Sequence, residues 1–326
     1  MTGLARAAGT RVGAARGNVA DVVQRFGVWV ALAVAIAYGV LFVPAFPTTQ
    51  NIDSVLRQGA TLGIVSLGET FVILTAGIDL SVGMLMGLVT VTSNGIMNGD
   101  PGLILPILAL ALVIGVSVGV ANGLGVVVAR VHPLIVTLAM LSILQGLIFV
   151  YTDRTVGTAP LEFRQLAYGS VGPIPAPFLL LVILAAVCWV VLSSTPLGRY
   201  IYAVGGDEGN ARRAGIPVGR VKVAVYVICG ALAAIAGLVL AARLGSGYTL
   251  AGSGFELDAV VAVVLGGTSL AGGRGGVVGT VAGVFLLALV ANLLNLAGVS
   301  PFVQKIVDGV IIVGAIALYT ARTRET

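Results

Sequence analysis

The sequence predicts an all-α polytopic membrane protein, and three observations support that prediction. Of the 326 residues, 58% are hydrophobic and only 10% are charged, whereas soluble domains carry about a quarter charged residues. The mean hydropathy is +1.09. The charged side chains gather in short segments, separated by uncharged apolar stretches of the ~20 residues that a helix needs to cross a bilayer. This composition excludes a soluble enzyme, a disulfide scaffold and a disordered chain.

Ten apolar stretches are candidate membrane-spanning helices. The first, residues 26–46, is too long for the apolar core of a typical signal peptide and ends at Pro44 and Pro47, so we expect an uncleaved span. The others are expected near residues 58–77, 80–97, 103–129, 133–151, 175–194, 222–242, 258–271, 276–296 and 302–320. The stretch over 258–271 spans only about 14 residues and leads into a glycine-rich segment, which predicts a broken or re-entrant helix.

The positive charges predict the orientation of these spans. With the N-terminus inside, 13 of the 18 Lys and Arg residues fall in inner segments, which favours cytoplasmic N- and C-termini and an even number of spans. We expect a basic segment over 1–25, one transmembrane domain over 26–320 and a cytoplasmic tail over 321–326. Within the domain, the two halves are expected over 26–151 and 175–320, with a long cytoplasmic loop over 195–221.

The two halves resemble each other in sequence. Residues 77–83 align with residues 267–273 at an offset of 190, and Asn122 aligns with Asn292 at an offset of 170. Five spans in each half would place the halves in opposite orientations. Inverted repeats with interrupted helices recur in transporters, where the interruptions mark the pathway. The sequence therefore predicts two inverted five-helix halves with broken or short helices near a pathway.

Acidic residues inside apolar spans are candidates for a functional site, because a charge there costs at least ~2.5 kcal/mol. Glu69 and Asp308 are expected to lie deepest. Asp79 and Asp258 fall near predicted span ends, where they can face water, and Glu256 lies at the mouth of the eighth span.

Two of these acids have a structural alternative. Lys305, three residues before Asp308, is at a helical spacing that favours an ion pair. For Glu69, a pathway or proton-relay role and a packing contact with the Ser66 or Thr70 hydroxyl remain equally open.

Several chemistries lack the residues they need. Cys188 and Cys229 lie in apolar runs and are interpreted as packing residues, and no CxxC pair is present to bind a metal. His132 is the only histidine, which disfavours Ser-His-Asp catalysis and histidine-rich metal sites. No lysine follows a glycine, so no phosphate-binding loop is present and we expect no cofactor on this chain. The net charge of +5 reflects cytoplasmic loops, and no nucleic-acid partner is expected.

The loop over 195–221 contains a candidate docking helix. Asp207 and Glu208 stand where a helix would begin, and Arg212 and Arg213 fall in its last turn, which complements the helix dipole at both ends. The loop is either a solvated, topology-setting connection or a surface helix that docks on a cytoplasmic partner.

Four motifs carry a resemblance to a known family. They are ILTAGIDLSVG (73–83), HPLIVTLAML (132–141), GRYIYAVGGDEGNARRAGIPV (198–218) and GFELDAVVAVVLGGTSLAGGRGGVVGT (254–280). In this order they resemble the permease subunits of bacterial ribose-type ABC importers, a family with xylose, galactose, inositol and autoinducer-2 permeases. The resemblance covers residues 50–320.

The resemblance implies a permease in the bacterial cytoplasmic (inner) membrane that works with several partners. These are a second permease copy or paralogue, an ABC ATPase, commonly a tandem sugar-type subunit, that binds ATP and Mg²⁺, and an extracytoplasmic sugar-binding protein. The surrounding membrane lipid is the remaining partner.

The resemblance also assigns residues to two sites. The loop resembles the coupling helix that contacts the ATPase, with the residues Gly205, Gly206, Asp207, Glu208, Asn210, Arg212, Arg213, Gly215 and Ile216. For the translocation path, the resemblance implies two segments, GIDLS (77–81) and ELDAVVAVVLGGTSLAGG (256–273). Together with the polar and acidic residues of the spans, these segments give the path candidates Glu69, Thr75, Asp79, Ser81, Asn122, Thr137, Glu256, Asp258, Thr268 and Ser269.

The leading functional hypothesis is a permease subunit for a monosaccharide, namely a ribose-like pentose, a hexose or a polyol. A nucleoside or furanose-signal permease is the alternative within the same class. An ion-coupled secondary transporter, with Glu69, Asp79 and Asp308 as coupling carboxylates, is the alternative from another class. A membrane enzyme would need a clustered nucleophile and base or a metal set, which the sequence lacks.

Overall fold

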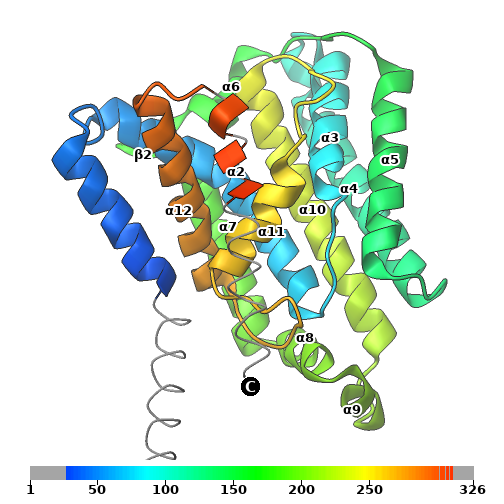
Figure 1. The fold of residues 1–326 in the computed structure, drawn as a ribbon. Helices are drawn as coiled ribbons and strands as arrows, with labels where there is room; N and C mark the ends of the chain where they lie inside the picture. The colour runs from blue at the N-terminus through cyan, green and yellow to red at the C-terminus, as the bar shows by residue number, and fades with distance from the viewer. Residues whose placement is uncertain (1–26, 301, 305, 308, 311–326) are drawn as a thin grey trace, which may run out of the picture.

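The chain folds into a bundle of apolar helices in a computed structural model that describes residues 27–300, 302–304, 306–307 and 309–310 (Figure 1). The elements are the helix Gly27–Phe42, α2 (Thr49–Leu74), α3 (Val82–Met97), η1 (Pro101–Leu103), α4 (Ile104–Val127), α5 (Pro133–Tyr151), α6 (Leu161–Tyr168), β1 (Ser170–Val171), β2 (Ile174–Pro175), α7 (Ala176–Ser194), α8 (Pro196–Gly206), α9 (Glu208–Arg213), α10 (Val218–Leu244), α11 (Phe255–Leu265) and α12 (Val277–Leu296).

The predicted all-α membrane class is confirmed. Five described helices are long and apolar enough to cross a membrane, and Gly27–Phe42 and Val82–Met97 are shorter apolar helices. The eighth span is a helix of 11 residues, so its predicted shortness is confirmed. Most of the tenth span, residues 302–320, lies outside the described residues, as do the basic segment 1–25, the tail 321–326, Lys305 and Asp308.

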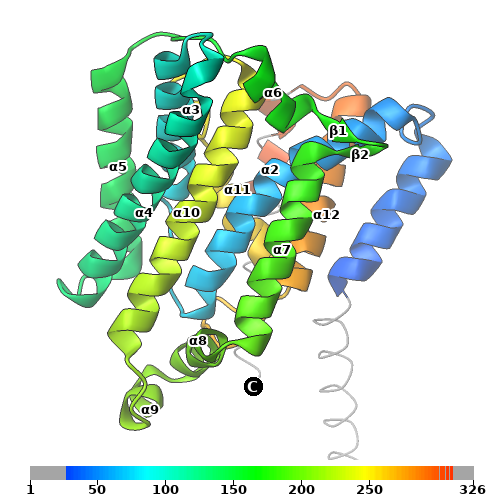
Figure 2. The same ribbon diagram turned by 180° about the vertical axis from the view of Figure 1, so that it is seen from behind.

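The bundle has two distinct ends, which Figures 1 and 2 show from opposite sides. The helices α8 and α9 lie at one end, called the α9 end, and α6 with the β1–β2 hairpin lies at the other, called the α6 end. The sequence analysis predicted neither α6 nor the hairpin. Arg57 of α2 holds both in place, because its guanidinium bonds the Ala167 carbonyl at 2.6 Å, the Gly169 carbonyl at 3.1 Å and the Asp53 carboxylate.

The interior is organised around α10, which packs along α2, α3 and α4. The glycines of α4 allow the closest approach. A Cβ at Gly119 would overlap the Tyr226 carbonyl oxygen, and one at Gly115 would overlap the Gly230 carbonyl oxygen. The GxxxG spacing of α4 is therefore a helix-packing feature, as small residues generally are in membranes.

Two short helices, α3 and α11, start inside the bundle. At 1.5 Å per residue, α3 is about 24 Å long and α11 about 16 Å, and both are shorter than the ~30 Å hydrocarbon core. They run in opposite directions and their first turns adjoin, because a Cβ at Gly83 would overlap the Glu256 carboxylate. The non-helical segments 75–81 and 245–254 lead into them, so the predicted broken helices are present.

One of the two repeat alignments is wrong. Residues 77–81 follow the end of α2 and residues 267–273 follow the end of α11, and both helices end toward the α9 end, where the Gly273 amide donates to the Leu74 carbonyl at 3.0 Å. Equivalent segments of inverted halves would lie at opposite ends of the bundle. The alignment of Asn122 with Asn292 pairs α4 with α12, each the fourth membrane helix of its half, and is compatible with the repeat. Glycine-rich turns in a chain built from few residue types resemble one another by chance, which explains the false match.

We predict that Gly119→Ala destabilises the protein by about 1–3 kcal/mol, because the added methyl meets the backbone of α10. Gly146→Ala in α5 is the matched control, since nothing lies within 4 Å of a Cβ there. Thermal unfolding of the purified variants in detergent measures the difference. Equal unfolding temperatures for the two variants would contradict the packing assignment.

Candidate functional site

Four of the predicted path residues form one buried cluster, called the acid–amide cluster: Glu69, Asp79, Ser81 and Asn122. Asp79 Oδ1 accepts hydrogen bonds from the Ser81 amide at 3.0 Å and the Ser81 hydroxyl at 2.6 Å. The Asn122 amide group of α4 donates to both oxygens of Asp79 and to Ser81 Oγ. Glu69 Oε1 of α2 accepts the Asp79 amide at 3.0 Å. The cluster thus satisfies the backbone of the non-helical segment between α2 and α3.

The environment of the two acids differs from what the sequence analysis expected. Asp79 is only 1% exposed, so the expectation that it faces water at a span end is wrong. Glu69 contacts neither the Ser66 nor the Thr70 hydroxyl, and bonds the Asp79 amide and the Cys229 thiol instead. Within the described part of the chain, neither acid forms an ion pair with Lys or Arg.

Buried polar atoms without a partner adjoin this cluster. Among the described residues, Tyr226 Oη of α10 and Asn122 Oδ1 have no hydrogen-bond partner, although both side chains are at most 1% exposed. A Cβ at Gly77 would lie 2.8 Å from Tyr226 Oη, which places the phenol against the segment before α3. Buried polar groups are normally paired, so these two atoms are exceptions within the described interior.

The two predicted threonines hold the same segment. Thr137 Oγ1 of α5 donates to the Ile78 carbonyl at 3.2 Å, so α5 also contacts the segment before α3. Thr75 Oγ1 donates to the Val72 carbonyl at 2.9 Å and closes the last turn of α2. Both hydroxyls are therefore used in backbone contacts.

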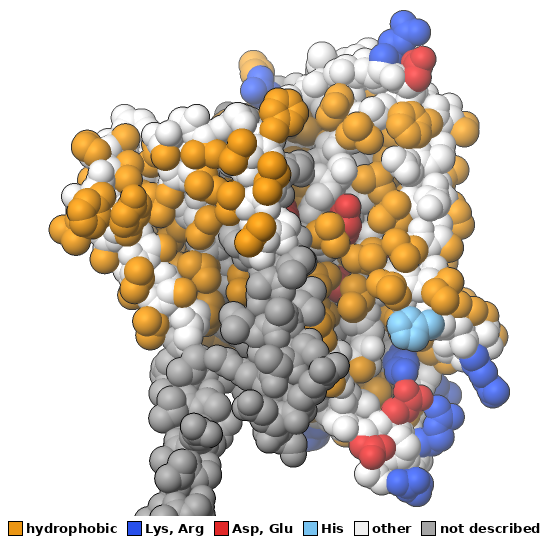
Figure 3. Space-filling view, viewed as in Figure 1, with side chains coloured by type: hydrophobic (Ala, Val, Ile, Leu, Met, Phe, Trp, Pro, Cys, Tyr) orange, Lys and Arg blue, Asp and Glu red, His pale blue; other side chains and the backbone are white. Residues whose placement is uncertain are grey.

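Glu256 and Asp258 occupy the first turn of α11 and are half-buried. Glu256 accepts the Gly254 amide at 3.1 Å, and its carboxylate fills the space beside Gly83. Figure 3 shows acidic side chains in the middle of this otherwise apolar face of the bundle. The structure therefore brings Glu256 next to the start of α3, which directly follows Ser81 of the acid–amide cluster.

Thr268 and Ser269 lie elsewhere, in the connection between α11 and α12 at the α9 end. The Ser269 amide donates to the Arg274 carbonyl at 2.9 Å, and the Gly272 amide donates to the Ser269 carbonyl at 2.9 Å. Both side chains are buried. The predicted path residues thus fall into two groups, one at the starts of α3 and α11 and one in the segment over 266–276.

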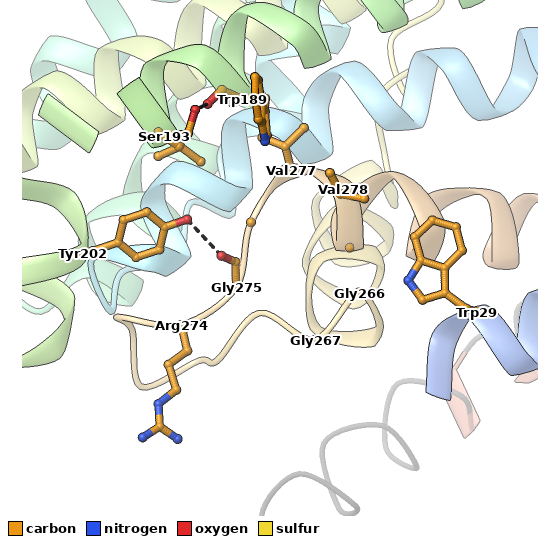
Figure 4. Close-up of a pocket in the computed structure, with 13 residues that line it drawn as sticks. Trp29, Trp189, Ser193, Tyr202, Gly266, Gly267, Arg274, Gly275, Val277 and Val278 are labelled. Carbon is orange, nitrogen blue, oxygen red and sulfur yellow. Dashed lines mark hydrogen bonds between the residues drawn. The ribbon is translucent and has the colours of Figure 1, made fainter. Parts of the chain in front are cut away.

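A cavity of about 890 Å³ lies beside the second group (Figure 4). Trp29 of the first helix, Trp189 and Ser193 of α7, Tyr202 of α8 and Arg274 line it together with glycine backbone. The Tyr202 hydroxyl donates to the Gly275 carbonyl at 2.9 Å. The sequence analysis missed these side chains, although tryptophan and arginine near span ends are a known signal of a membrane boundary.

A helix, α9, is present at the position where the sequence predicted one. Asp207 caps it, because its Oδ1 accepts the Asn210 amide at 2.8 Å, and Gly215 follows with a φ of 80°. Arg213 bonds the Asn210 side chain, and the Ile216 amide donates to the Ala211 carbonyl at 3.1 Å. The remainder of the expected loop is helical as well, since α8 covers Pro196–Gly206.

Glu208 ties α9 to α10. Its carboxylate contacts Lys222 Nζ at 2.6 Å and Arg212 Nη2 at 3.0 Å. The hydrogen bond from Lys222, followed by the contact with Arg212, lowers the pKa of Glu208 below its ordinary value. Both contacts are therefore present at neutral pH and are lost only as the pH falls through that lowered pKa.

Comparison with known proteins identifies the family of this chain. A model of the family described as "Branched-chain amino acid transport system / permease component" matches residues 51–316. The chain belongs to this permease family. No solved structure gives a significant match.

Several relatives of this permease carry descriptive names. This chain is 42% identical to the "Ribose import permease protein RbsC" of Escherichia coli K12 over 292 residues, which are 88% of this chain and 91% of the relative. The RbsC protein of Bacillus subtilis is 42% identical over 307 residues, 91% of this chain and 93% of the relative. The "L-arabinose transport system permease protein AraH" of E. coli K12 is 36% identical over 314 residues, 93% of each chain. The predicted membership of the ribose-type permeases is confirmed.

We predict that Asn122→Ala destabilises the permease by about 1–3 kcal/mol, because Asp79 and Ser81 lose a buried donor. Ser142→Ala is the control, since this exposed hydroxyl bonds only its own helix. Thermal unfolding in detergent measures both. An Asn122→Ala protein as stable as the Ser142→Ala protein would contradict the anchoring role of the cluster.

Proposed function

We propose that this permease is the membrane-spanning subunit of an ATP-driven importer for a monosaccharide, a ribose-like pentose, a hexose or a polyol. The identity of 42% to a ribose import permease, across 91% of that protein, carries the proposal. The relatives named for ribose and L-arabinose favour a sugar over a nucleoside or a furanose signal. The family match favours a transport component over an enzyme and over an ion-coupled transporter.

The ATPase partner is proposed to bind at the α9 end. Seven described basic residues lie there with only two acids, Asp207 and Glu208, whereas four described basic and four acidic residues lie at the α6 end. The basic residues of the α9 end are Arg130, Arg199, Arg212, Arg213, Arg220, Lys222 and Arg274. The positive-inside rule supports a cytoplasmic position for this end, and the bacterial relatives support a place in the cytoplasmic (inner) membrane. ATP and Mg²⁺ would bind the ATPase and not this chain.

The translocation path is proposed to run along the face that carries the starts of α3 and α11. Glu256 and Asp258 are half-buried there, and a carboxylate is too costly to face lipid. A second permease copy or a paralogue would cover this face and enclose a polar path between the two subunits. A sugar-binding protein would deliver the bound sugar at the α6 end.

A pull-down of the tagged chain from native membranes in mild detergent tests the proposed function. Mass spectrometry is expected to find an ATPase with a phosphate-binding loop in near-equal amount, and a sugar-binding protein in smaller amount. Uptake of radiolabelled D-ribose, L-arabinose and D-allose into proteoliposomes then identifies the substrate. A chain that is recovered alone and drives uptake without ATP would overturn the proposal in favour of the ion-coupled transporter.

We predict that changing Asp207 and Glu208 together to lysine abolishes transport and leaves membrane insertion intact. The change removes the cap of α9 and sets like charges against Arg212 and Lys222. Uptake and the amount of chain in the membrane fraction are measured. The matched control is Asp207→Asn with Glu208→Gln, which keeps a capping side chain and is expected to retain more uptake. Normal uptake in the lysine variant would contradict the proposal that α9 couples the permease to the ATPase.

A further inference from the structure

Three segments meet by backbone contact at the α9 end, with no side chain between them. The first segment is the end of α8 at Gly205, and the second is the end of α2 at Leu74. The third is Gly272–Gly273 of the α11–α12 connection. A Cβ at Gly205 would overlap the Leu74 carbonyl oxygen and lie 2.5 Å from the Gly273 amide nitrogen. The Gly273 amide donates to the Leu74 carbonyl at 3.0 Å. We call this contact the glycine junction.

The glycines are required by the geometry of the junction. Gly272 has a φ of 85° and Gly273 a φ of 71°, a backbone region that favours glycine. A Cβ at Gly272 would lie 2.8 Å from the Gly205 carbonyl oxygen, and one at Gly273 would lie 2.8 Å from the Gly206 amide. A side chain at any of these positions would push α8 away from the other two segments.

Each segment of the junction leads to a different part of the molecule. On one side, α8 continues through Asp207 into α9, which Glu208 joins to α10. On the second side, Leu74 ends α2, and the next seven residues carry Asp79 and Ser81 of the acid–amide cluster. On the third side, Gly272 and Gly273 belong to the connection that holds Thr268 and Ser269.

A second link joins α8 to the same connection. The Tyr202 hydroxyl, one turn before Gly205, donates to the Gly275 carbonyl at 2.9 Å (Figure 4). Gly198, Ile201 and Val204 of α8 are buried, so the helix is packed against the bundle along its length. Closely packed contacts of this kind transmit displacement, because they have no free volume in which to absorb it.

We propose that the glycine junction carries movement of α8 and α9 to both non-helical segments at once, and that Gly205 is a positioning residue for transport. This rests on the proposed function, because the movement would come from an ATPase bound at α9. A push on α8 reaches the end of α2, and through it the segment before α3, and it also reaches the connection before α12.

The test compares Gly205→Ala with Gly146→Ala, a glycine of α5 outside the junction and the coupling loop, where no described atom lies within 4 Å of a Cβ. Each variant is purified as the complex recovered in the pull-down, reconstituted in proteoliposomes, and assayed for ATP hydrolysis and for uptake of the radiolabelled sugar that the unmodified complex transports. Sugar transported per ATP hydrolysed is expected to fall about tenfold in Gly205→Ala and to stay unchanged in Gly146→Ala. A merely structural role for Gly205 would lower assembly or both activities together, and leave this ratio unchanged.

An unchanged ratio in an assembled Gly205→Ala complex overturns the proposal. If the Gly205→Ala permease does not assemble with its partners, the Tyr202→Phe variant tests the proposal instead. This change removes only the hydrogen bond to the Gly275 carbonyl and adds no volume. A lowered ratio in Tyr202→Phe supports the junction, and an unchanged one overturns it. Failure of the proposed function is distinguishable, since the unmodified chain would then bring down no ATPase.

Discussion

The structure depends on satisfying backbone polar groups where helices stop inside the membrane. Lipid offers no hydrogen bonds, so non-helical backbone is stable there only when protein covers it and pairs its N–H and C=O groups. Between α2 and α3 the chain meets this constraint with Glu69, which accepts the Asp79 amide, and with Asp79, which accepts the Ser81 amide. Asn122 then fixes Asp79 from α4. The acidic side chains of the interior thus act first as backbone acceptors.

This constraint explains why glycine and small residues dominate the places where segments cross. α10 is in backbone contact with α4 through Gly115 and Gly119, and this close packing brings Asn122 within reach of Asp79. At the α9 end, Gly205, Gly272 and Gly273 let three chain segments meet without side chains. Close approach of two chain segments is therefore needed for pairing their backbone polar groups, because a backbone hydrogen bond between segments forms only where the two backbones are in contact.

The sequence predicted those features that depend on local chemistry. Apolar runs indicate the positions of the spans, and Asp207 and Gly215 mark the two ends of α9 by their residue types alone. The sequence could not predict that Glu69 turns away from Ser66 and Thr70, to the Asp79 amide ten residues down the chain. That contact depends on how the chain reverses after Leu74. Likewise α6 depends on Arg57, which lies about 110 residues earlier and bonds the Ala167 carbonyl.

The two groups of predicted path residues are connected through the glycine junction in spite of their separation. Glu69 and Leu74 share α2, so the acid–amide cluster and the end of α2 at the glycine junction move together if that helix moves as a rigid body. Thr268 and Ser269 sit in the connection that contacts the same junction. The resemblance placed both groups in one pathway without giving a reason for their connection. The backbone contact among Gly205, Leu74 and Gly273 would supply that reason, because the proposed displacement of α8 acts on the end of α2 and on the α11–α12 connection together.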